Sequence, residues 1–280
     1  MKPYLIDTHS HLQFKDYDAD RDQVILRMRQ KKVWTISVGT TIPNCEDAVR
    51  LAEKEDGVWA AIGYHPVHVS SKQTYEGEGS NKTYSLKKMR ELCESKKVVA
   101  IGETGLDYHR LDENDDLDKI KSRQKEIFLD HLGLARDFDL PVIIHCRDAM
   151  NDLLKIIEKE IKNGFNMRGV MHCYAGPWEE AERILNLGLL ISFTGPVTFK
   201  PKKNSDPETH VHRVIERTPL EKLMIETDAP FLAPEPYRGK RNEPVYVEET
   251  AKKIAELKKI DIPEVARKTT ETAIKFFGLR

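Results

Sequence analysis

The sequence predicts an α/β fold, and more narrowly a single-domain (β/α)8 TIM barrel that spans residues 1–280. Three observations support this prediction. Short apolar runs alternate with longer amphipathic stretches from one end of the chain to the other. Eight such runs occur, and each is followed by a stretch that is typical of a helix. The runs are mostly continuous in hydrophobicity, as expected of parallel strands that are buried on both faces.

The predicted strands begin with YLIDTH near the N-terminus and end with KLMIETD. An open, doubly wound sheet is the competing architecture. That fold more naturally carries a glycine-rich phosphate-binding turn after its first strand, whereas this chain has THSHL there. The barrel is therefore favoured, and its strands are predicted over residues 4–9, 33–39, 58–65, 98–103, 141–146, 169–173, 189–195 and 222–228.

Helix-like stretches fill the gaps between these strands, and two of them follow the last strand. Two polar, turn-rich loops at residues 70–83 and 108–122 look long. Both are expected on the C-terminal face of the barrel, where such folds build their functional sites. The helices are predicted over residues 18–31, 43–55, 85–97, 123–139, 148–161, 177–188, 207–217, 243–260 and 262–278.

Composition and charge exclude several classes of protein. The 45 basic and 46 acidic residues leave a formal net charge of −1, so any polyanion would have to be held by a local site. No run of about 18 apolar residues exists, so no membrane span is expected. The N-terminus lacks the pattern of a signal peptide, and the four cysteines form no CxxC pair. A cytoplasmic location is the expectation.

Polar side chains end several of the apolar runs. His9 and His11 lie two residues apart on the first strand, so both rings should face the same side. Alone, this pair is weak evidence, because ordinary structural histidines are common. Later strands end in an acid or a histidine where packing alone predicts an aliphatic residue, and these are Glu103, His145, His172 and Asp228. Burying unpaired carboxylates would cost on the order of several kcal/mol each.

In a barrel all eight strand ends converge on one face, so these six side chains are expected to meet. Four imidazoles and two carboxylates are too many for one tetrahedral zinc site with an open position. They suit two divalent metal ions, with a carboxylate such as Glu103 between them. The ligand set fits Zn²⁺, Mn²⁺, Co²⁺ or Ni²⁺, and Mg²⁺ with retained waters stays an alternative.

Motifs along the whole chain resemble those of the TatD family of metal-dependent deoxyribonucleases, within the amidohydrolase-like TIM barrels. The motifs are THSHL, GYHP, GETGLDY, PVIIHCRDA, GVMHCYAG, ISFTGPVTF, ETDAPFLAP and RGKRNEP, in this order. The resemblance implies one metal ion held by His9, His11, Glu103 and Asp228, and a second held by Glu103, His145 and His172. It also implies hydrolysis of phosphodiester bonds in DNA, often as a 3′–5′ exonuclease on single strands.

Three residues are candidates for proton transfer in such a reaction. Asp228 is the candidate general base, because a ligand carboxylate can also bond the attacking water. Glu226 shares its strand parity with Asp228, and either orients ligands, accepts a proton or forms a structural pair with a nearby Lys or Arg. His65 ends the third strand and is predicted to bind phosphate or to protonate the leaving group, with a structural cap as the alternative.

Three further residues are predicted to bind substrate. Arg147 follows His145 by two residues and could hold phosphate with two hydrogen bonds, or else pair with Asp148. Arg238 lies on the last barrel loop and would add positive charge to a nearly neutral protein. Tyr108 follows the fourth strand and is a candidate for stacking on an unpaired base, although aromatics near loops more often pack.

Two other functions compete with a nuclease. One is an amidohydrolase-type enzyme that acts on a small ester, amide or phosphoester; many such barrels bridge their metals with a modified lysine after strand four, where this chain has Glu103. The other is a non-catalytic barrel kept for partner binding, which predicts lost ligands. The complete set of six ligand candidates argues against the non-catalytic reading, and the oligomeric state stays open.

Overall fold

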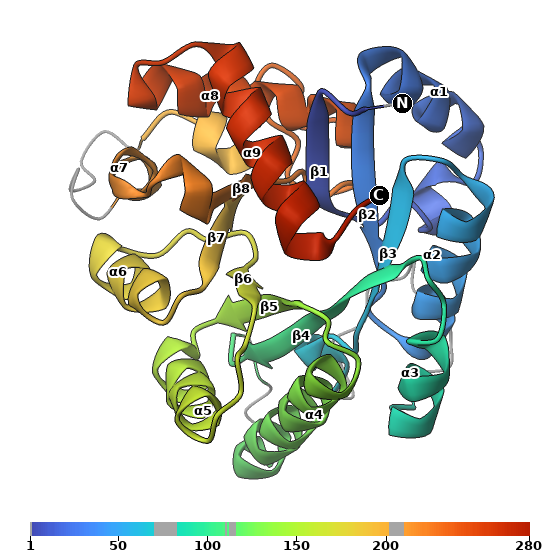
Figure 1. The fold of residues 1–280 in the computed structure, drawn as a ribbon, viewed down its shortest axis with the longest axis vertical. Helices are drawn as coiled ribbons and strands as arrows, with labels where there is room; N and C mark the ends of the chain where they lie inside the picture. Colours follow the sequence, from blue (N-terminus) through green and yellow to red (C-terminus); the bar gives the residue numbers. More distant parts are fainter. Residues whose placement is uncertain (1, 70–82, 110, 112–115, 202–209) are drawn as a thin grey trace.

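The computed structural model describes residues 2–69, 83–109, 111, 116–201 and 210–280. Eight strands form one sheet in the order β1 to β8, and all neighbouring pairs are parallel. A parallel bridge between Ser10 and Ala229 joins the two ends of the sheet. The predicted (β/α)8 barrel is therefore confirmed, with helices arranged around the strands (Figure 1).

The strands are β1 Leu5–Ser10, β2 Val33–Val38, β3 Val58–Ile62, β4 Val98–Asp107, β5 Val142–Arg147, β6 Gly169–Met171, β7 Leu190–Phe193 and β8 Leu223–Ile225. The helices are α1 Arg21–Lys31, α2 Ile42–Lys54, α3 Leu86–Leu92, α4 Leu117–Asp137, α5 Met150–Lys162, α6 Trp178–Asn186, α7 Val211–Arg217, α8 Val247–Lys258 and α9 Ile262–Phe277. No helix among the described residues is long and apolar enough to cross a membrane.

Local signals explain where some of these helices begin and end. The side chain of Asp261 accepts the backbone N–H of Glu264 at 2.7 Å, and Pro263 occupies the first turn of α9. Gly278 ends the same helix with a φ of 67°, in the left-handed region that favours glycine. Helix α2 begins at Thr41 in the same way as α9, because the Thr41 hydroxyl accepts an N–H from its first turn.

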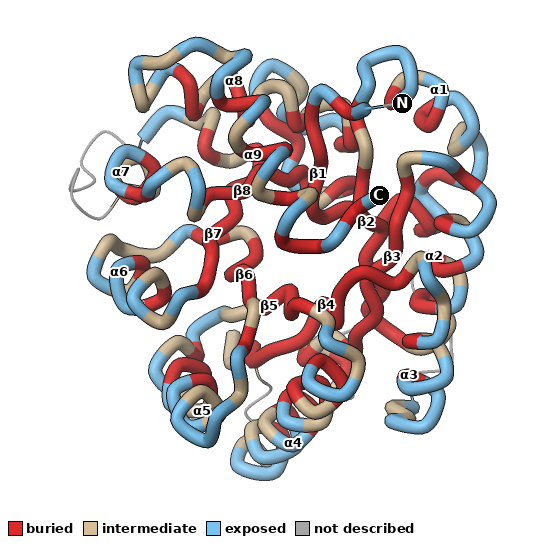
Figure 2. Tube along the Cα trace, viewed as in Figure 1, coloured by how far each residue is buried: buried red, intermediate tan, exposed pale blue. Residues whose placement is uncertain are grey.

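Two apolar clusters form the core. The larger lies between the strands and the surrounding helices, where Leu5 and Met28 are buried. The smaller fills the interior of the barrel near the start of the strands, and Phe276 and Phe277 of α9 belong to it. Helix α9 therefore covers the N-terminal end of the barrel, and most strand residues are buried, except at the end of β5 (Figure 2). The opposite, C-terminal end is left for a functional site.

Several predicted boundaries differ from the structure. Strands β3 and β6 end at Ile62 and Met171, so His65 and His172 lie just after their strands. Strand β4 runs on to Asp107, past a register shift between Ile101 and Thr104, so Glu103 lies within the strand and not at its end. Strand β8 ends at Ile225, so Asp228 lies on the following loop. Helix α4 begins at Leu117, inside the segment predicted as a loop over 108–122. Residues 70–82 of the other predicted long loop, and residues 207–209 of the predicted helix over 207–217, lie outside the described residues.

Candidate metal centre

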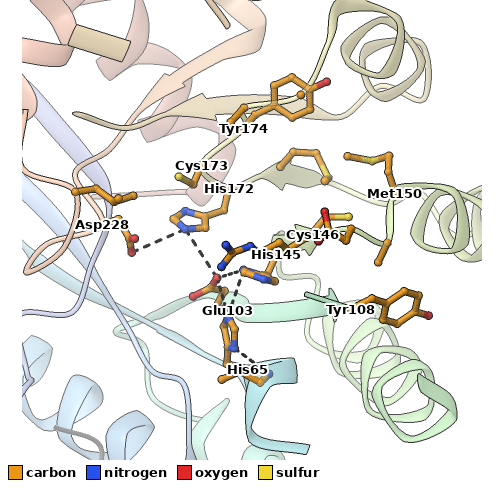
Figure 3. A pocket seen from close by; sticks show the side chains of 18 of the residues that line it. His65, Glu103, Tyr108, His145, Cys146, Met150, His172, Cys173, Tyr174 and Asp228 are labelled. Atoms are coloured by element: carbon orange, nitrogen blue, oxygen red, sulfur yellow. Dashed lines mark hydrogen bonds and ion pairs between the residues drawn. The ribbon is translucent and has the colours of Figure 1, made fainter. Parts of the chain in front are cut away.

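Six side chains meet at the C-terminal end of the barrel, from five strands and the residues that directly follow them. They line or underlie one open cavity of about 1200 Å³ (Figure 3). The structure contains three overlapping groups of side chains that could hold a metal ion. Within each group, the nitrogen and oxygen atoms that could bind the ion lie within 4.8 Å of one another. Together the groups contain all six residues predicted to bind metal. The groups are His9, His11 and Glu103; His9, His172 and Asp228; and His65, Glu103 and His145. The convergence that the barrel predicted is therefore present in the structure.

His9 is the clearest sign that this cluster is built for a cation. Its ring is fully buried, and neither ring nitrogen forms a hydrogen bond with a described residue. Its Nε2 lies 3.5 Å from Oε2 of Glu103 and 3.7 Å from Oδ1 of Asp228. A buried imidazole without partners is costly, whereas a cation between these three groups would satisfy all of them. The donor set thus fits a divalent metal ion.

The rings of His11 and His172 are each oriented by an oxygen atom at Nδ1, on the side away from the cluster. Nδ1 of His11 donates to the carbonyl of Val38 at 2.7 Å, which leaves Nε2 facing Asp228 at 3.3 Å. Nδ1 of His172 lies 2.9 Å from Oε1 of Glu226, and Nε2 faces the cluster. Metal-binding histidines are commonly held by a carbonyl or carboxylate at the other ring nitrogen. Both rings are therefore preset to offer Nε2 to a metal.

His145 is held by two carboxylates, one of which the sequence analysis did not identify. Its Nδ1 lies 2.7 Å from Glu103 and its Nε2 lies 3.0 Å from Oδ2 of Asp107. Burial lowers the pKa of His145, but the hydrogen bonds with Asp107 and Glu103 outweigh it and raise that pKa to about 9. Asp107 was missed because the fourth strand was predicted to end at Glu103. Had the strand been extended through GETGLD, its spacing of four from Glu103 would have suggested a shared face.

Glu103 lies at the centre of the cluster and is only 4% exposed. Its Oε1 is 3.3 Å from Nε2 of His65 and 3.8 Å from Nε2 of His172. Burial raises the pKa of the Glu103 carboxyl, but His65, His172 and His145 outweigh burial and hold that pKa well below its usual range. Among the described residues, no Lys or Arg forms an ion pair with Glu103 or with Asp228. Imidazoles alone balance this buried negative charge.

Asp228 is fixed by the loop that closes the barrel. Its backbone N–H donates to the carbonyl of His9 at 2.8 Å, and the N–H of His11 donates to the carbonyl of Ala229 at 2.7 Å. The φ of Asp228 is 57°, a left-handed conformation that aspartate tolerates better than most residues. Because two main-chain bonds join this loop to β1, the Asp228 carboxylate is held against both histidines.

His65 faces the cluster but is oriented differently from His11 and His172. Its Nδ1 accepts the backbone N–H of Val67 at 3.1 Å, so the proton of a neutral His65 ring lies on Nε2. That nitrogen is 3.3 Å from Glu103 and 3.2 Å from Nδ1 of His145. His65 is therefore arranged to donate a hydrogen bond from Nε2, whereas the Nε2 atoms of His11 and His172 are arranged to bind a metal ion.

Of the four remaining predicted residues, one lies behind the cluster, two line the cavity and one does not line it. Glu226 is buried beside His172 and also accepts the backbone N–H of Cys173 at 2.6 Å, and no described Lys or Arg pairs with it. Tyr108 and Arg147 line the cavity. Arg238 does not line the cavity, because its guanidinium lies 4.2 Å from the ring centroid of Phe199.

Arg147 is the one cation among the residues that line this cavity in the described part of the chain. It is exposed, and its side chain forms no ion pair with a described residue. The alternative pairing with Asp148 is absent, because Asp148 lies 2.7 Å from Nδ1 of His109 instead. Arg147 therefore keeps its donors for a ligand.

Residues 6–278 match the family model described as TatD related DNase. This chain belongs to the TatD family. The resemblance inferred from the motifs is therefore confirmed over nearly the whole chain. Many relatives of this TatD chain carry names that state metal dependence and hydrolysis, so it is a member of a family of metal-dependent hydrolases.

Individual relatives agree with this assignment. The Bacillus subtilis protein named uncharacterized metal-dependent hydrolase YabD is 42% identical, over 98% of this chain and 99% of its own length. The Pantoea ananatis protein named 3′-5′ ssDNA/RNA exonuclease TatD is 30% identical, over 98% of this chain and 100% of its own length. The crystal structure of the TatD homolog YJJV from Escherichia coli covers 100% of both chains, with a TM-score of 0.83 and 28% identity.

Proposed function

We propose that this TatD-family protein hydrolyses phosphodiester bonds in DNA, as a 3′–5′ exonuclease on single strands, with two divalent metal ions. The observation that carries the proposal is the buried cluster of four imidazoles and two carboxylates at the base of an open cavity. The name of the Pantoea ananatis relative supports the choice of a single-stranded nucleic acid and of the 3′–5′ direction.

The six side chains divide into two ligand sets that share Glu103. His9, His11, Glu103 and Asp228 would hold one ion, and Glu103, His145 and His172 would hold the other. The ions would lower the pKa of water and neutralise charge on the phosphate oxygens. Zn²⁺, Mn²⁺, Co²⁺, Ni²⁺ and Mg²⁺ all suit this nitrogen and oxygen donor set.

The protein's own groups act on the attacking water and on the leaving oxygen. Asp228 accepts the proton of the attacking water at its carboxylate, since the histidines around it favour its ionised form. His65 donates a hydrogen bond from Nε2 to the leaving oxygen and stabilises its negative charge, because Val67 fixes the tautomer that carries the proton there. The leaving oxygen takes its proton from solvent in the open cavity. Glu226 fixes the ring of His172 and takes no part in proton transfer.

The cavity also offers groups for the rest of a nucleotide. Arg147 would bind a phosphate with two hydrogen bonds, as its unpaired guanidinium allows. Tyr108 would supply ring surface to an unpaired base. Arg238 is less suited to phosphate binding at this cavity, because it lies over Phe199.

The proposal is tested by digesting a 5′-labelled single-stranded DNA oligonucleotide with chelator-stripped protein, with and without Mg²⁺, Mn²⁺ or Zn²⁺. A metal-dependent ladder that shortens from the 3′ end is expected. E103A and H145A should abolish the ladder in protein that stays folded by circular dichroism. The proposal fails if either variant keeps full activity, or if the wild-type protein binds metal but cleaves no oligonucleotide. Turnover of small esters in that second case would favour the amidohydrolase-type reaction.

A further inference from the structure

The cavity extends well beyond the metal cluster. One end holds Asp228, His172 and Glu103 (Figure 3). The other end holds Tyr108, which follows β4, and Met150, which begins α5. A single phosphodiester group at the metal cluster would leave this far end open, because the cavity measures about 1200 Å³. We call the far end, formed by Tyr108, Cys146, Met150, Tyr174 and Glu180, the distal limb.

The two tyrosines of the distal limb are fixed in place. The hydroxyl of Tyr108 donates to Asp152 at 3.1 Å, and the hydroxyl of Tyr174 donates to the carbonyl of Pro177 at 2.6 Å. Because both hydroxyls are engaged, the tyrosines offer the cavity chiefly ring surface. Met150 adds a polarisable side chain to the same wall. Such surfaces suit a flat aromatic ligand.

Glu180 is the polar group of this limb. Its carboxylate is half-buried and forms no hydrogen bond or ion pair with a described residue. The nearby Arg183 is engaged elsewhere, 3.2 Å from Asn151 and 3.5 Å from Glu158. Burial raises the pKa of Glu180 even though Arg183 opposes the shift. A half-buried carboxylate that faces a cavity without a partner is suited to accept hydrogen bonds from a ligand.

The chain makes room for this carboxylate. A Cβ added at Gly176 would lie 2.9 Å from Oε2 of Glu180 and 2.7 Å from the hydroxyl of Tyr174. Any larger residue at position 176 would displace one of these two groups. The alternative role for Glu180 is purely structural, because it lies in the first turn of α6, where negative charge is favourable. Glu179 occupies the same first turn but does not line the cavity. A substitution at Glu179 therefore tests the structural role in the helix without touching the cavity.

We propose that the distal limb binds a nucleobase and that Glu180 accepts a hydrogen bond from its exocyclic amino group. This inference rests on the proposed nuclease function, and it adds a base preference to it. A carboxylate accepts from the amino group of cytosine but meets only the carbonyl oxygen of thymine at the corresponding position. The protein is therefore expected to release a terminal dC faster than a terminal dT.

The test uses single-stranded oligonucleotides that differ only in a 3′-terminal dC or dT, under single-turnover conditions with Mn²⁺. The rate for dC over the rate for dT is expected to be about threefold to tenfold in the wild-type protein. In E180Q this ratio should fall to about one, because an amide can bond either base. E179Q should keep the wild-type ratio. The ratio does not depend on how much of a preparation is folded, since both rates come from the same sample.

Each other outcome is decisive. A ratio near one in the wild-type protein, or the same ratio in E180Q as in the wild type, overturns the nucleobase site and leaves the nuclease function standing. A fall in both E179Q and E180Q assigns the effect to the helix terminus and also overturns it. Wild-type protein that cleaves neither oligonucleotide with any metal overturns the proposed function itself.

Discussion

Oε1 of Glu226 lies 2.9 Å from Nδ1 of His172, and both side chains are buried. The carboxylate attracts a proton to Nδ1, so the ring presents Nε2 to Glu103 at 3.8 Å and to Asp228 at 3.9 Å. Burial lowers the pKa of His172, but Glu226 and Glu103 outweigh it and raise that pKa to about 10. A metal ion would take the place of this positive charge.

Glu226→Gln should weaken metal binding while leaving every ligand in place. The amide keeps the shape of the side chain but no longer holds the Nδ1 proton with a negative charge. A loss of about 10-fold to 100-fold in affinity is expected, measured by calorimetric titration of Mn²⁺ into stripped protein. E235Q, on an exposed loop residue, serves as control. Unchanged affinity in Glu226→Gln would contradict the orienting role.

Asp107→Asn tests the second carboxylate that orients a candidate metal ligand, in this case His145. Asp107 bonds Nε2 of His145 and also accepts the backbone N–H of His109 at 2.9 Å. Asparagine can still accept from His109, so the local turn should survive. We expect an affinity loss of about 10-fold to 100-fold for the ion that His145 is proposed to bind, and no change in the stoichiometry at saturation. A variant that binds metal like the wild-type protein would show that Asp107 is only a turn residue.

The difference between Glu103 and Asp107 indicates what the sequence could reveal here. An acid directly after the apolar run VVAIG stands out against packing, so Glu103 was identified. The register shift after Ile101 carries β4 four residues further, and no apolar periodicity marks that extension. Asp107 therefore read as a loop residue. The candidate ligand positions follow from strand order. The carboxylates that bond these candidate ligands depend on contacts between distant segments, which periodicity does not encode.

His131 gives a second example, in which the helix was predicted but the role of the residue was not. The sequence places His131 on a predicted helix and gives no sign of its role, but the residue is fully buried on α4. Its Nδ1 donates to the carbonyl of Ile127 at 2.6 Å, and its Nε2 accepts the backbone N–H of Tyr64 at 3.2 Å. The ring thereby anchors the segment that carries His65. Predicting such a role requires knowing which strand the helix packs against.

The same contacts predict a dependence of stability on pH. Burial lowers the pKa of His131 from 6.5 to about 4. Between these values the unfolded chain binds the proton and the folded protein does not, so the free energy of unfolding should decrease as pH falls from about 6.5 to about 4. The loss amounts to about 3 kcal/mol. Urea unfolding at pH 7.5 and 4.5, in chelator, should show less acid sensitivity in H131Q than in the wild-type protein. H212Q is the control, and equal acid sensitivity in all three proteins would refute the assignment.

His65 is predicted to stabilise the leaving oxygen with a hydrogen bond, and the choice of substrate can isolate that contribution. A sugar alkoxide concentrates negative charge on the leaving oxygen, whereas 4-nitrophenolate spreads this charge over its own ring. H65A should therefore lose about 100-fold to 1000-fold in kcat on a DNA oligonucleotide. On thymidine 5′-(4-nitrophenyl) phosphate the loss should be less than about tenfold, because the leaving group needs little stabilisation.

Metal content separates this role from that of a ligand. Nδ1 of His65 is occupied by the Val67 N–H, so H65A should bind the same number of Mn²⁺ ions as the wild-type protein, measured by elemental analysis. H172A, which removes a ligand candidate, should bind fewer. An equal loss of activity on both substrates would reduce His65 to a positioning residue for Glu103. A lower metal content in H65A would instead place Nε2 of His65 among the metal ligands, with the tautomer reversed from the one that Val67 favours.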